Sequence, residues 1–406
     1  MKSYRKNVFT MLINKNEMNV LYIIDPGTVG GATIAFVEMI LKLKELGVEP
    51  LVLTGRRNSF NDKLDELCIK NIPINHQTAL VPFTFKTPKW PIILFQYVCK
   101  YYISRFTSRK IIKNKVNLSS IDIIHTNSAR NDIGCWISKE YGIPHICHIR
   151  EFGDKDFSCI KLLPNFYMYL NNYTTCFIAI SNAVRKHWIS KGISKEKVKL
   201  VYDGISYEDI NVSSDNSKKN TKLKIIMAGG IVKTKGQHLA VEALLYLPAN
   251  IRDNISIDFA GWFVPKYKRE IIKFAKSNGL SRYINFLGPL NDVHKRLGDY
   301  QIGLTCSRSE GFGLVTAEYM HAQLGVIASD SGACPELIDN NINGLLFKSG
   351  DARDLARCIE LYYNNRDLLI DYSNSARLKA SERFTSQRNA NQIFEVYKTM
   401  LNEYEK

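Results

Sequence analysis

Short apolar runs alternate with amphipathic stretches of helical length along most of the chain. In the first half, apolar runs of the length of buried strands occupy residues 19–25, 50–55, 121–126, 143–149, 176–181 and 198–204. Intervening segments such as 32–47 have apolar residues at helical spacing and end at a glycine, here Gly47. Because strands joined by helices run parallel, this alternation predicts a parallel sheet with helices on both faces.

The pattern stops at residues 206–222, a polar stretch rich in Ser, Asn and Asp that is typical of a linker. It then restarts, with apolar runs at 223–230, 255–262, 283–288, 301–307, 324–329 and 343–347. The sequence therefore predicts an α/β fold with two Rossmann-like domains, 1–205 and 223–385, that face each other across a cleft. The last segment, 386–406, is expected to form a helix that packs back on the N-terminal domain.

The amino-acid composition indicates where in the cell the protein is expected to reside. The 406 residues are 45% hydrophobic and 23% charged, and no apolar run is long enough to span a bilayer. The N-terminal segment is polar and lacks the apolar core of a signal peptide. Nine cysteines without a C-x-x-C pair favour reduced thiols. We therefore expect a cytoplasmic protein.

The net charge of +16 favours anionic partners. Residues 67–121 contain no Asp or Glu, and the segment 86–115 interleaves basic residues with aromatic ones. One interpretation is an amphipathic helix on an anionic membrane surface, which would make the protein peripheral on the inner membrane face. The other is a core helix whose basic residues are solvated. We favour the membrane. Nucleic acid is not expected, because no recognised nucleic-acid-binding module is present.

Two glycine-containing loops follow predicted strands. In "DPGTVGGATIAF", Gly27, Gly30 and Gly31 allow the backbone to approach a ligand, although a plain strand-to-helix turn explains them equally well. The loop lacks the G-x-G-x-x-G pattern of nicotinamide-binding proteins. In "AGGIVKTKGQHL", Lys233 and Lys235 indicate either a phosphate partner or solvated lysines.

A third loop, "SRSEGFGLVTAE", is more specific. Gly311 and Gly313 free the backbone just before a predicted helix, whose first amides and dipole favour a diphosphate. Glu310 and Glu318 bracket this turn, and a carboxylate that accepts two neighbouring hydroxyls can hold a ribose or a hexose. The alternative is that Glu310 caps the helix and Glu318 lies on its surface.

Together these segments resemble the retaining glycosyltransferases of family four, which have the GT-B fold. "EGFGLVTAE" resembles the E-x7-E signature of that family, and "SDSGACPELI" resembles its Gly-x-Pro-Glu-rich loop. "CFIAISNAVRKHWISKGISKEKVKLVYDGIS" resembles the segment that closes its N-terminal domain, and "NGLLFKSGD" the strand and turn after the signature. The resemblance implies a transferase that moves a hexose from a nucleotide diphosphate sugar, UDP- or GDP-linked, to a lipid-linked or polysaccharide acceptor in cell-surface glycan synthesis.

The resemblance also implies roles for particular residues. Glu310 would contact the donor hexose and Glu318 the ribose, while Lys235 would contact the diphosphate. His148, in "IPHICHIREFGD", resembles the active-site histidine, whereas His145 is expected to be a core residue. The remaining positions on the donor side are Gly30, Gly31, Gly230, Lys233, Gly311 and the amides of Phe312, Gly313, Leu314 and Val315; those on the acceptor side are His125, Arg150 and Glu151.

Two departures from the family pattern are visible. The family usually has an arginine where this chain has Gly230, so one diphosphate contact is missing or is supplied by another basic group such as Lys233. The usual Asn-Gly before the linker is Asp203-Gly204, a mild change because both suit a turn. The first departure keeps open a non-catalytic protein that binds nucleotide sugar. A sugar-nucleotide epimerase is a further alternative, against which the E-x7-E spacing argues.

No metal or cofactor is expected. In the family, retention is described as attack on the same face of the sugar, with the leaving phosphate helping to take the acceptor proton. A lysine and backbone amides can neutralise the charge that grows on that phosphate. Asp154 and Asp156 match the D-x-D pattern of metal-using transferases, but they fall in a charged loop of the other domain, so we interpret the match as chance.

Overall fold

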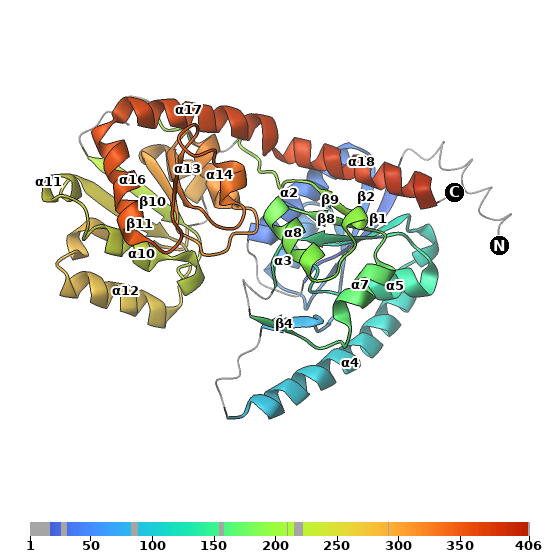
Figure 1. Cartoon of the computed structure of the whole chain (residues 1–406). Coiled ribbons are helices and arrows are strands. Elements are labelled where there is room, and N and C mark those ends of the chain that lie inside the picture. Colours follow the sequence, from blue (N-terminus) through green and yellow to red (C-terminus); the bar gives the residue numbers. More distant parts are fainter. Residues whose placement is uncertain are drawn as a thin grey trace. The chain divides into compact units, whose positions relative to one another are not determined.

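The computed structural model describes residues 17–25, 31–82, 88–153, 158–208, 210–214, 222–290 and 292–404. Contacts divide the chain into two compact units. The first unit comprises Met1–Val201 with Ser386–Lys406, and the second comprises Tyr202–Thr385 (Figure 1). Each unit contains a parallel β-sheet with helices, so the predicted fold class of two Rossmann-like α/β domains is confirmed.

Seven parallel strands form the sheet of the first unit, in the order β3-β2-β1-β5-β6-β8-β9. The strands are β1 (Met18–Ile23), β2 (Val48–Thr54), β3 (Lys70–Pro73), β5 (Ile123–Thr126), β6 (His145–Ile149), β8 (Cys176–Ala179) and β9 (Val198–Leu200). The α-helices are α2 (Gly31–Glu45), α3 (Ser59–Glu66), α4 (Trp90–Lys115), α5 (Ile133–Tyr141), α7 (Phe166–Tyr173), α8 (Asn182–Ser190) and α18 (Ser386–Tyr404), with 3-10 turns η1 (Leu118–Ser120) and η2 (Lys195–Lys197). A separate antiparallel pair joins β4 (Leu80–Pro82) to β7 (Cys159–Lys161).

The two faces of this sheet carry separate cores. Val20 and Tyr22 of β1 belong to a cluster with residues of α2 and α18, whereas Leu21 and Ile23 belong to a cluster with residues of α4 and α5. Successive side chains of a strand point to opposite faces, so a strand that is covered on both sides needs apolar residues at every position. This requirement explains why the four buried residues of β1, Val20 to Ile23, are all apolar.

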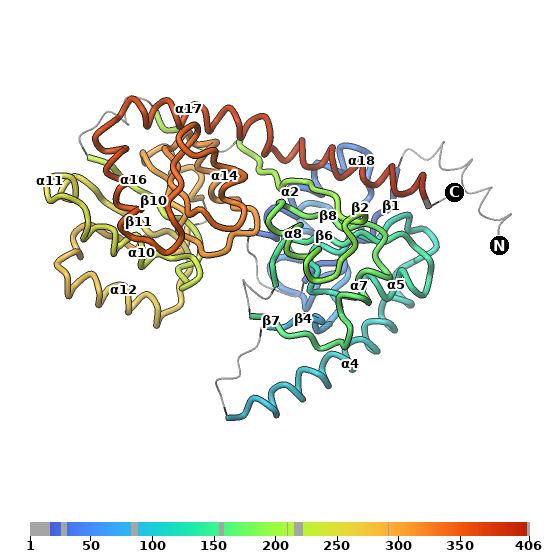
Figure 2. Tube along the Cα trace, viewed as in Figure 1, coloured from blue at the N-terminus to red at the C-terminus, as the bar shows by residue number. Residues whose placement is uncertain are grey.

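The C-terminal helix α18 packs beside α2 on one face of this sheet (Figure 2). Its Tyr397 hydroxyl lies 3.1 Å from the hydroxyl of Tyr22 and 2.5 Å from Nδ1 of His125. Nε2 of His125 in turn lies 3.2 Å from Nδ1 of His148. All four side chains have no exposed surface. A buried line of hydrogen bonds therefore runs from α18 into strands β1, β5 and β6.

Six parallel strands form the sheet of the second unit, in the order β12-β11-β10-β13-β14-β15. The strands are β10 (Leu223–Ala228), β11 (Ile255–Ala260), β12 (Ile284–Gly288), β13 (Ile302–Thr305), β14 (Gly325–Ser329) and β15 (Leu345–Phe347). The α-helices are α10 (Gln237–Ala243), α11 (Ala249–Arg252), α12 (Pro265–Ser277), α13 (Val293–Arg296), α14 (Leu314–His321), α15 (Cys334–Leu337), α16 (Ala352–Asn364) and α17 (Arg366–Arg383), with 3-10 turns η3 (Lys233–Lys235), η4 (Ser281–Tyr283) and η5 (Leu297–Asp299).

In each sheet the strand order reverses at one place, between β1 and β5 in the first unit and between β10 and β13 in the second. The connections that leave the two strands at such a switch point run in opposite directions. Room for a ligand therefore opens at the carboxyl ends of these strands. A ligand site is thus expected at the loops after β1, β5, β10 and β13.

All the apolar runs that were predicted as strands form strands of the two sheets. The pattern missed β3, β4 and β7, because each is only three or four residues long and carries polar or proline residues. The segment expected to be a linker also differs in part. Ser213 is buried, and its hydroxyl donates to the carbonyl oxygen of Tyr300 at 2.7 Å. Residues 210–214 thus pack on the second unit, while residues 209 and 215–221 lie outside the described residues.

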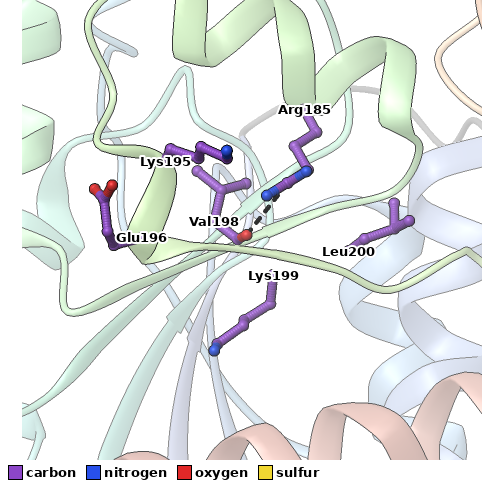
Figure 3. Close-up of a pocket in the computed structure, with 6 residues that line it drawn as sticks. All are labelled: Arg185, Lys195, Glu196, Val198, Lys199 and Leu200. Atoms are coloured by element: carbon purple, nitrogen blue, oxygen red, sulfur yellow. Dashed lines mark hydrogen bonds between the residues drawn. The ribbon is translucent and has the colours of Figure 1, made fainter.

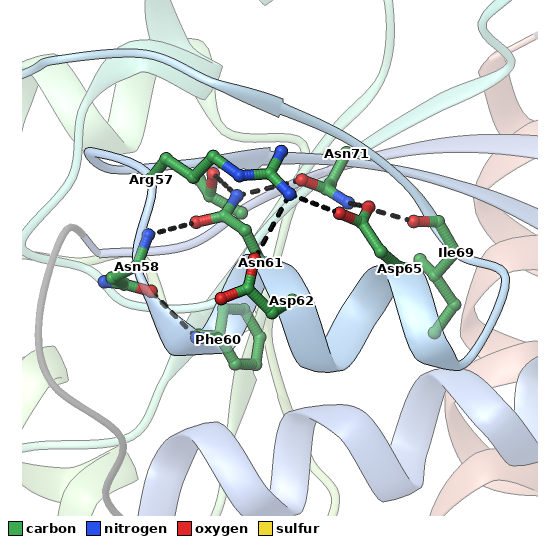
Figure 4. Close-up of polar contacts among 9 residues, drawn as sticks. Arg57, Asn58, Phe60, Asn61, Asp62, Asp65, Ile69 and Asn71 are labelled. Carbon is green, nitrogen blue, oxygen red and sulfur yellow. Dashed lines mark hydrogen bonds and ion pairs between the residues drawn. The ribbon is translucent and has the colours of Figure 1, made fainter.

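A buried amide fixes the start of α3 (Figure 4). Asn61 has no exposed surface, and its Nδ2 donates to Oγ1 of Thr54 at 2.7 Å and to Oδ1 of Asn71 at 2.8 Å. Its Oδ1 accepts from the backbone N–H of Asn58 at 3.0 Å, and the Asn58 side chain accepts from the N–H of Phe60 at 2.9 Å. These bonds satisfy backbone donors at the helix start and fasten α3 to β2 and β3.

We expect Asn61→Leu to lower the free energy of unfolding by about 2–3 kcal/mol, because it leaves the partners of the amide buried without hydrogen bonds. Urea denaturation measures this change. The control is Asp62→Ala on the same helix, which removes only an exposed ion pair with Arg57. That control is expected to cost less than about 1 kcal/mol. Equal losses in the two variants would contradict the structural role of Asn61.

We expect Tyr397→Phe to lower the free energy of unfolding by about 1–3 kcal/mol, because the buried groups of Tyr22 and His125 lose their partner. The same chemical change at Tyr102, which is 52% exposed, is the control and is expected to leave stability within about 0.5 kcal/mol. Urea denaturation again measures both. A Tyr397→Phe variant as stable as the control would show that the line of hydrogen bonds does not hold α18 in place.

Candidate functional site

Two loops meet at the switch point of the second sheet. One follows β10 and contains η3, and the other follows β13 and leads into α14. The backbone N–H of Arg308 donates to the carbonyl oxygen of Thr234 at 3.1 Å and so joins them. At Gly236, φ is +77° and an added Cβ would lie 2.3 Å from the carbonyl oxygen of Cys306. Only glycine allows this approach, so the two loops that were predicted to bind a diphosphate are in direct contact.

Lys235 of the first loop and Glu310 of the second form an ion pair. Nζ of Lys235 lies 2.8 Å from Oε2 and 3.2 Å from Oε1 of Glu310, whose side chain is only 15% exposed. The Glu310 carbonyl oxygen accepts from the N–H of Ala333 at 2.9 Å. At Gly332, where φ is +58°, an added Cβ would lie 2.4 Å from that oxygen. The "SDSGACPELI" loop therefore fixes the backbone at Glu310.

The start of α14 lies directly after this acid. Gly313 precedes Leu314 with φ +99°, a left-handed conformation that glycine adopts without strain. Phe312 is buried, with its ring 5.5 Å from that of Phe384 and 6.1 Å from that of Tyr202. The Phe312 side chain is thus an anchor of the turn. Its predicted contribution to a ligand is its backbone amide, like those of Gly313, Leu314 and Val315.

Two contacts fasten α14 to the sheet below it. The Tyr319 hydroxyl accepts from the N–H of Ala228, at the end of β10, at 2.6 Å. The hydroxyls of Thr316 and Thr305 lie 2.9 Å apart. Between these anchors, Glu318 is partly buried, as is Gly311 in the turn before the helix. The expected contact of Glu318 with a ribose stays a prediction.

Positive charge gathers beside the Lys235–Glu310 pair. The pKa of His238 is lowered first by burial and then by the charges of Arg308 and Lys233. Both cations therefore lie close enough to this imidazole to disfavour its protonation. Lys233 and Arg308 come from the two loops that meet at the switch point, and both side chains are exposed. The edge of this sheet thus suits an anionic ligand.

Gly230 lies against the indole of Trp262. An added Cβ at this glycine would lie 2.8 Å from Cε2 and Cζ2 of the ring. Trp262 follows the end of β11 and is 59% exposed. Any larger residue at position 230 would therefore displace the indole.

A second polar cluster occupies the switch point of the first sheet. Asp25 follows β1, Ser128 follows β5, and Arg150 and Glu151 follow β6. The Ser128 hydroxyl lies 2.7 Å from Oε1 of Glu151 and 3.2 Å from Oδ2 of Asp25. Burial raises the pKa of Asp25, an effect that Arg130 and Ser128 oppose. Oδ1 of Asp25 is buried and has no hydrogen-bond partner in the described part of the chain, so this carboxylate can still accept a hydrogen bond.

Arg150 is oriented by a hydrogen bond from its Nε to Oδ1 of Asn127 at 2.8 Å, and it is 7% exposed. His148 lies two residues earlier, inside β6, with no exposed surface. Burial lowers the pKa of His148 and of His125 well below the usual value, so both imidazoles are neutral at pH 7. Of these predicted site residues, the structure brings Arg150 and Glu151 to the carboxyl end of the sheet and places the histidines beneath them.

His145 is a core residue, as predicted. Its Nε2 lies 2.8 Å from Oγ1 of Thr126, and its Nδ1 lies 3.2 Å from the carbonyl oxygen of Tyr173. Burial lowers its pKa to about 4. It has no exposed surface and so offers nothing to a ligand.

Some predicted positions fall outside the described residues, namely Gly27, Gly30, Asp154 and Asp156. Gly31 is described and forms the first residue of α2. In the described part of the chain, no group of three or more His, Cys, Asp or Glu side chains is placed to hold a metal ion.

A shallow depression of about 450 Å³ lies at the edge strand of the first unit (Figure 3). Half of its lining is basic; the lining residues are Arg185, Lys195, Glu196, Val198, Lys199 and Leu200. None of these residues belongs to the two clusters described above, and Arg185 is already bonded to the carbonyl oxygen of Val198 at 3.4 Å. We do not count this depression as part of the site.

Sequence reasoning missed Asp25, Asn127, Ser128, Arg308 and Trp262. Each lies within three residues of the end of a strand that the apolar pattern had predicted. That position was the available signal, because ligands bind at the carboxyl ends of parallel strands. Their side-chain contacts join segments far apart in the sequence and so left no local pattern.

Two protein-family models match the chain. The model described as Glycosyltransferase Family 4 matches residues 29–209, and the model described as Glycosyl transferases group 1 matches residues 209–379. Among curated proteins, an uncharacterized glycosyltransferase of Methanocaldococcus jannaschii is 24% identical over 382 residues, which cover 92% of this chain and 95% of that protein.

A second relative, from Campylobacter jejuni, is named GalNAc-alpha-(1->4)-GalNAc-alpha-(1->3)-diNAcBac-PP-undecaprenol alpha-1,4-N-acetyl-D-galactosaminyltransferase. It is 23% identical over 310 residues, or 75% of this chain and 80% of that protein. Among solved structures, Anabaena HepE in complex with UDP-glucose has a TM-score of 0.77 at 20% identity and covers 94% of this chain and 100% of that one. This likeness shows the GT-B fold. With its two halves matched by two different glycosyltransferase models, the chain is a glycosyltransferase of the GT-B fold.

Proposed function

We propose that the protein is a retaining, metal-independent hexosyltransferase that uses a UDP- or GDP-linked sugar and acts on a lipid-linked or polysaccharide acceptor in cell-surface glycan synthesis. The observation that carries this proposal is the Lys235–Glu310 pair at the switch point of the second sheet, directly before α14. The names of the relatives support it, since HepE was solved with UDP-glucose and the Campylobacter relative is named for an undecaprenol-linked acceptor.

In this proposal the second unit holds the donor. Lys235, Lys233 and the amides that begin α14 would bind the diphosphate, Glu310 the hexose and Glu318 the ribose. As the bond between sugar C1 and the phosphate oxygen breaks, negative charge grows on the leaving phosphate, and fixed cations and amides stabilise that charge. The acceptor oxygen then bonds to C1 on the same face, and its proton passes to a phosphate oxygen. No carboxylate nucleophile takes part.

The first unit would supply groups for the acceptor. Arg150 and Glu151 follow the end of β6 and lie beside Ser128 and Asn127, so they are our candidates for direct contact with an acceptor hydroxyl. His148 and His125 lie within their strands and are fully buried. We therefore assign them to the layer that supports Arg150. Gly30 and Gly31 remain proposed donor contacts from the loop before α2.

Helix α4 supports a peripheral position on the inner membrane face. Tyr101, Ser108 and Ile112 are buried against the first unit, and Arg105 pairs with the buried Asp132 at 2.8 Å. The opposite face exposes large apolar side chains: Ile92 61%, Phe95 68%, Tyr102 52%, Ile103 65% and Phe106 74%. Residues at this spacing share one side of a helix. The helix is thus apolar on two opposite sides, of which the protein core covers one.

The exposed lysines of α4 support an anionic membrane as the surface that its exposed apolar side contacts. Arg105 and Lys113 are used in ion pairs with Asp132 and Glu140, but Lys100, Lys110 and Lys115 are exposed. A second copy of a chain with net charge +16 would bring like charges together, whereas anionic headgroups attract them. In the described part of the chain, no helix is both long and apolar enough to cross a bilayer.

The donor prediction separates phosphate binding from sugar binding. Thermal shift over a panel of UDP- and GDP-sugars first identifies the donor, since a ligand of the folded state raises its melting temperature. Lys235→Ala is then expected to weaken the nucleotide diphosphate and the donor sugar alike by about tenfold or more, because a charge-assisted hydrogen bond is lost. Glu310→Ala is expected to weaken only the donor sugar and to abolish its slow hydrolysis.

The matched control for this experiment is Lys266→Ala, an exposed lysine on α12 that is expected to change neither affinity. Chelation of divalent cations is expected to leave donor hydrolysis unchanged. Binding without any release of nucleotide would indicate the non-catalytic alternative. A wild-type protein that binds no sugar nucleotide at millimolar concentration would refute the proposed function.

The membrane prediction uses vesicles of phosphatidylcholine with or without phosphatidylglycerol. Wild-type protein is expected to sediment with the anionic vesicles, and the Phe95→Ser, Phe106→Ser double variant to bind them about tenfold more weakly or worse, because two aromatic side chains no longer enter the interface. The control replaces Ile272 and Phe274, two exposed apolar residues of α12, by serine. Equal sedimentation of both double variants, or self-association that the Phe variant abolishes, would contradict the membrane assignment.

A further inference from the structure

An exposed apolar patch follows the end of β11 in the second unit. Trp262, Phe263 and Val264 are consecutive and are 59%, 37% and 40% exposed. Single exposed apolar residues are ordinary, but three in succession at the carboxyl end of a parallel strand are not. The neighbouring cation Lys268 lies 4.2 Å from the centroid of the Phe263 ring. The patch thus combines aromatic surface with positive charge.

This patch is attached to the loop after β10. The N–H of Ile231 donates to the carbonyl oxygen of Trp262 at 2.7 Å, and the N–H of Val264 donates to that of Ile231 at 3.1 Å. At Gly261, where φ is +148°, an added Cβ would lie 2.0 Å from the carbonyl oxygen of Gly229. The backbone hydrogen bonds thus hold the two loops side by side, and the indole of Trp262 lies against Gly230.

A buried side chain with spare hydrogen-bonding capacity lies under the same loop. Gln237 is 1% exposed, and its Nε2 donates to the carbonyl oxygen of Gly230 at 3.0 Å. Its Oε1 is buried and has no partner among the described residues. An unused buried acceptor is uncommon because it is costly. The Gln237 amide thus places a hydrogen-bond acceptor without a partner close to Gly230.

We infer that Trp262 is a stacking platform for the base of the donor nucleotide. The inference rests on the proposed function, because Lys235 and Glu310 fix where the phosphates and the hexose would lie. The strand order β11-β10-β13 places Trp262 on one side of η3 and Glu310 on the other. A nucleotide sugar laid across β10 with its hexose at Glu310 therefore directs its base toward the indole. Stacking on an aromatic ring needs no particular base edge, since every base has a π-face.

The inference also gives Gly230 a function. A side chain at this position would push the indole away, because even a Cβ comes within 2.8 Å of the ring. Gly230 has no left-handed φ, so alanine can be introduced there without backbone strain. Gly230→Ala is therefore a variant that moves the ring and leaves the fold intact.

Intrinsic fluorescence and calorimetry test the inference. Trp262 is the most exposed of the tryptophans, the others being Trp90 at 37%, Trp136 at 3% and Trp188 at 1%. The thermal-shift panel identifies the donor sugar, and the corresponding nucleoside diphosphate (UDP or GDP) is expected to quench the tryptophan fluorescence of the wild-type protein. Trp262→Ala is expected to weaken binding of this nucleoside diphosphate about tenfold, the effect of losing one stacked base. Trp262→Phe is expected to keep most of the affinity, because a ring remains, but to lose the fluorescence quenching. The free nucleoside should show the same loss in Trp262→Ala.

A double-mutant cycle tests whether Gly230→Ala affects nucleotide binding through the indole of Trp262. Gly230→Ala is expected to weaken binding several-fold in the wild type and to have no further effect when Trp262 is already alanine. A Trp262→Ala variant that binds the nucleotide like wild type would overturn the inference while leaving the proposed function intact. A loss confined to the sugar-linked donor would overturn the base assignment in favour of stacking on the hexose. No binding to any variant or to wild type would refute the proposed function instead.

Discussion

The reversal of strand order between β10 and β13 is the constraint on which the proposed donor site depends. The connections after β10 and β13 leave the sheet in opposite directions. The Arg308–Thr234 hydrogen bond and the close approach of Gly236 to Cys306 hold these two loops in contact. The Lys235–Glu310 pair spans the junction. Because Gly332 and Ala333 hold the backbone at Glu310, the carboxylate is positioned by a third loop and not by the ion pair alone.

The first unit uses the same constraint with different chemistry. At its switch point the polar groups are mainly acceptors, Asp25 and Glu151, bridged by a single serine hydroxyl and flanked by Arg130 and Arg150. Beneath them, a line of buried tyrosine and histidine side chains runs to α18. In the described part of this line, the Tyr22 hydroxyl has no bonded partner besides Tyr397. Either direction of donation leaves one buried proton without an acceptor, on the Tyr22 hydroxyl or on Nε2 of His148, which is buried without a partner among the described residues.

Much of this could be predicted from the sequence, for physical reasons that differ between elements. Strands covered on both faces contain several consecutive apolar residues, so β1 and β10 could be predicted, whereas β4 and β7, of three residues each, could not. Lys235 and Glu310 were found because glycines mark loops where backbone must approach something closely. The bridge from Ser128 to Asp25 and Glu151 was not, because its members come from three separate strands. The burial of His148 could not be predicted either, because the pattern of apolar and polar residues along β6 does not show at which residue the strand ends and the loop begins.

Gly230 shows how a departure from a pattern can be explained only with its spatial neighbour. From the sequence alone, a glycine in place of a basic residue is a lost phosphate contact. In the structure the glycine is the condition for an exposed indole to lie where it does, since a Cβ at that position and the ring cannot occupy the same space. The positive charge that an arginine would bring is already present nearby in Lys233 and Arg308. Glycine in place of arginine at position 230 therefore keeps a positive charge near the site and allows an aromatic ring to lie there. We expect this substitution to change how the nucleotide is bound and not to abolish its binding.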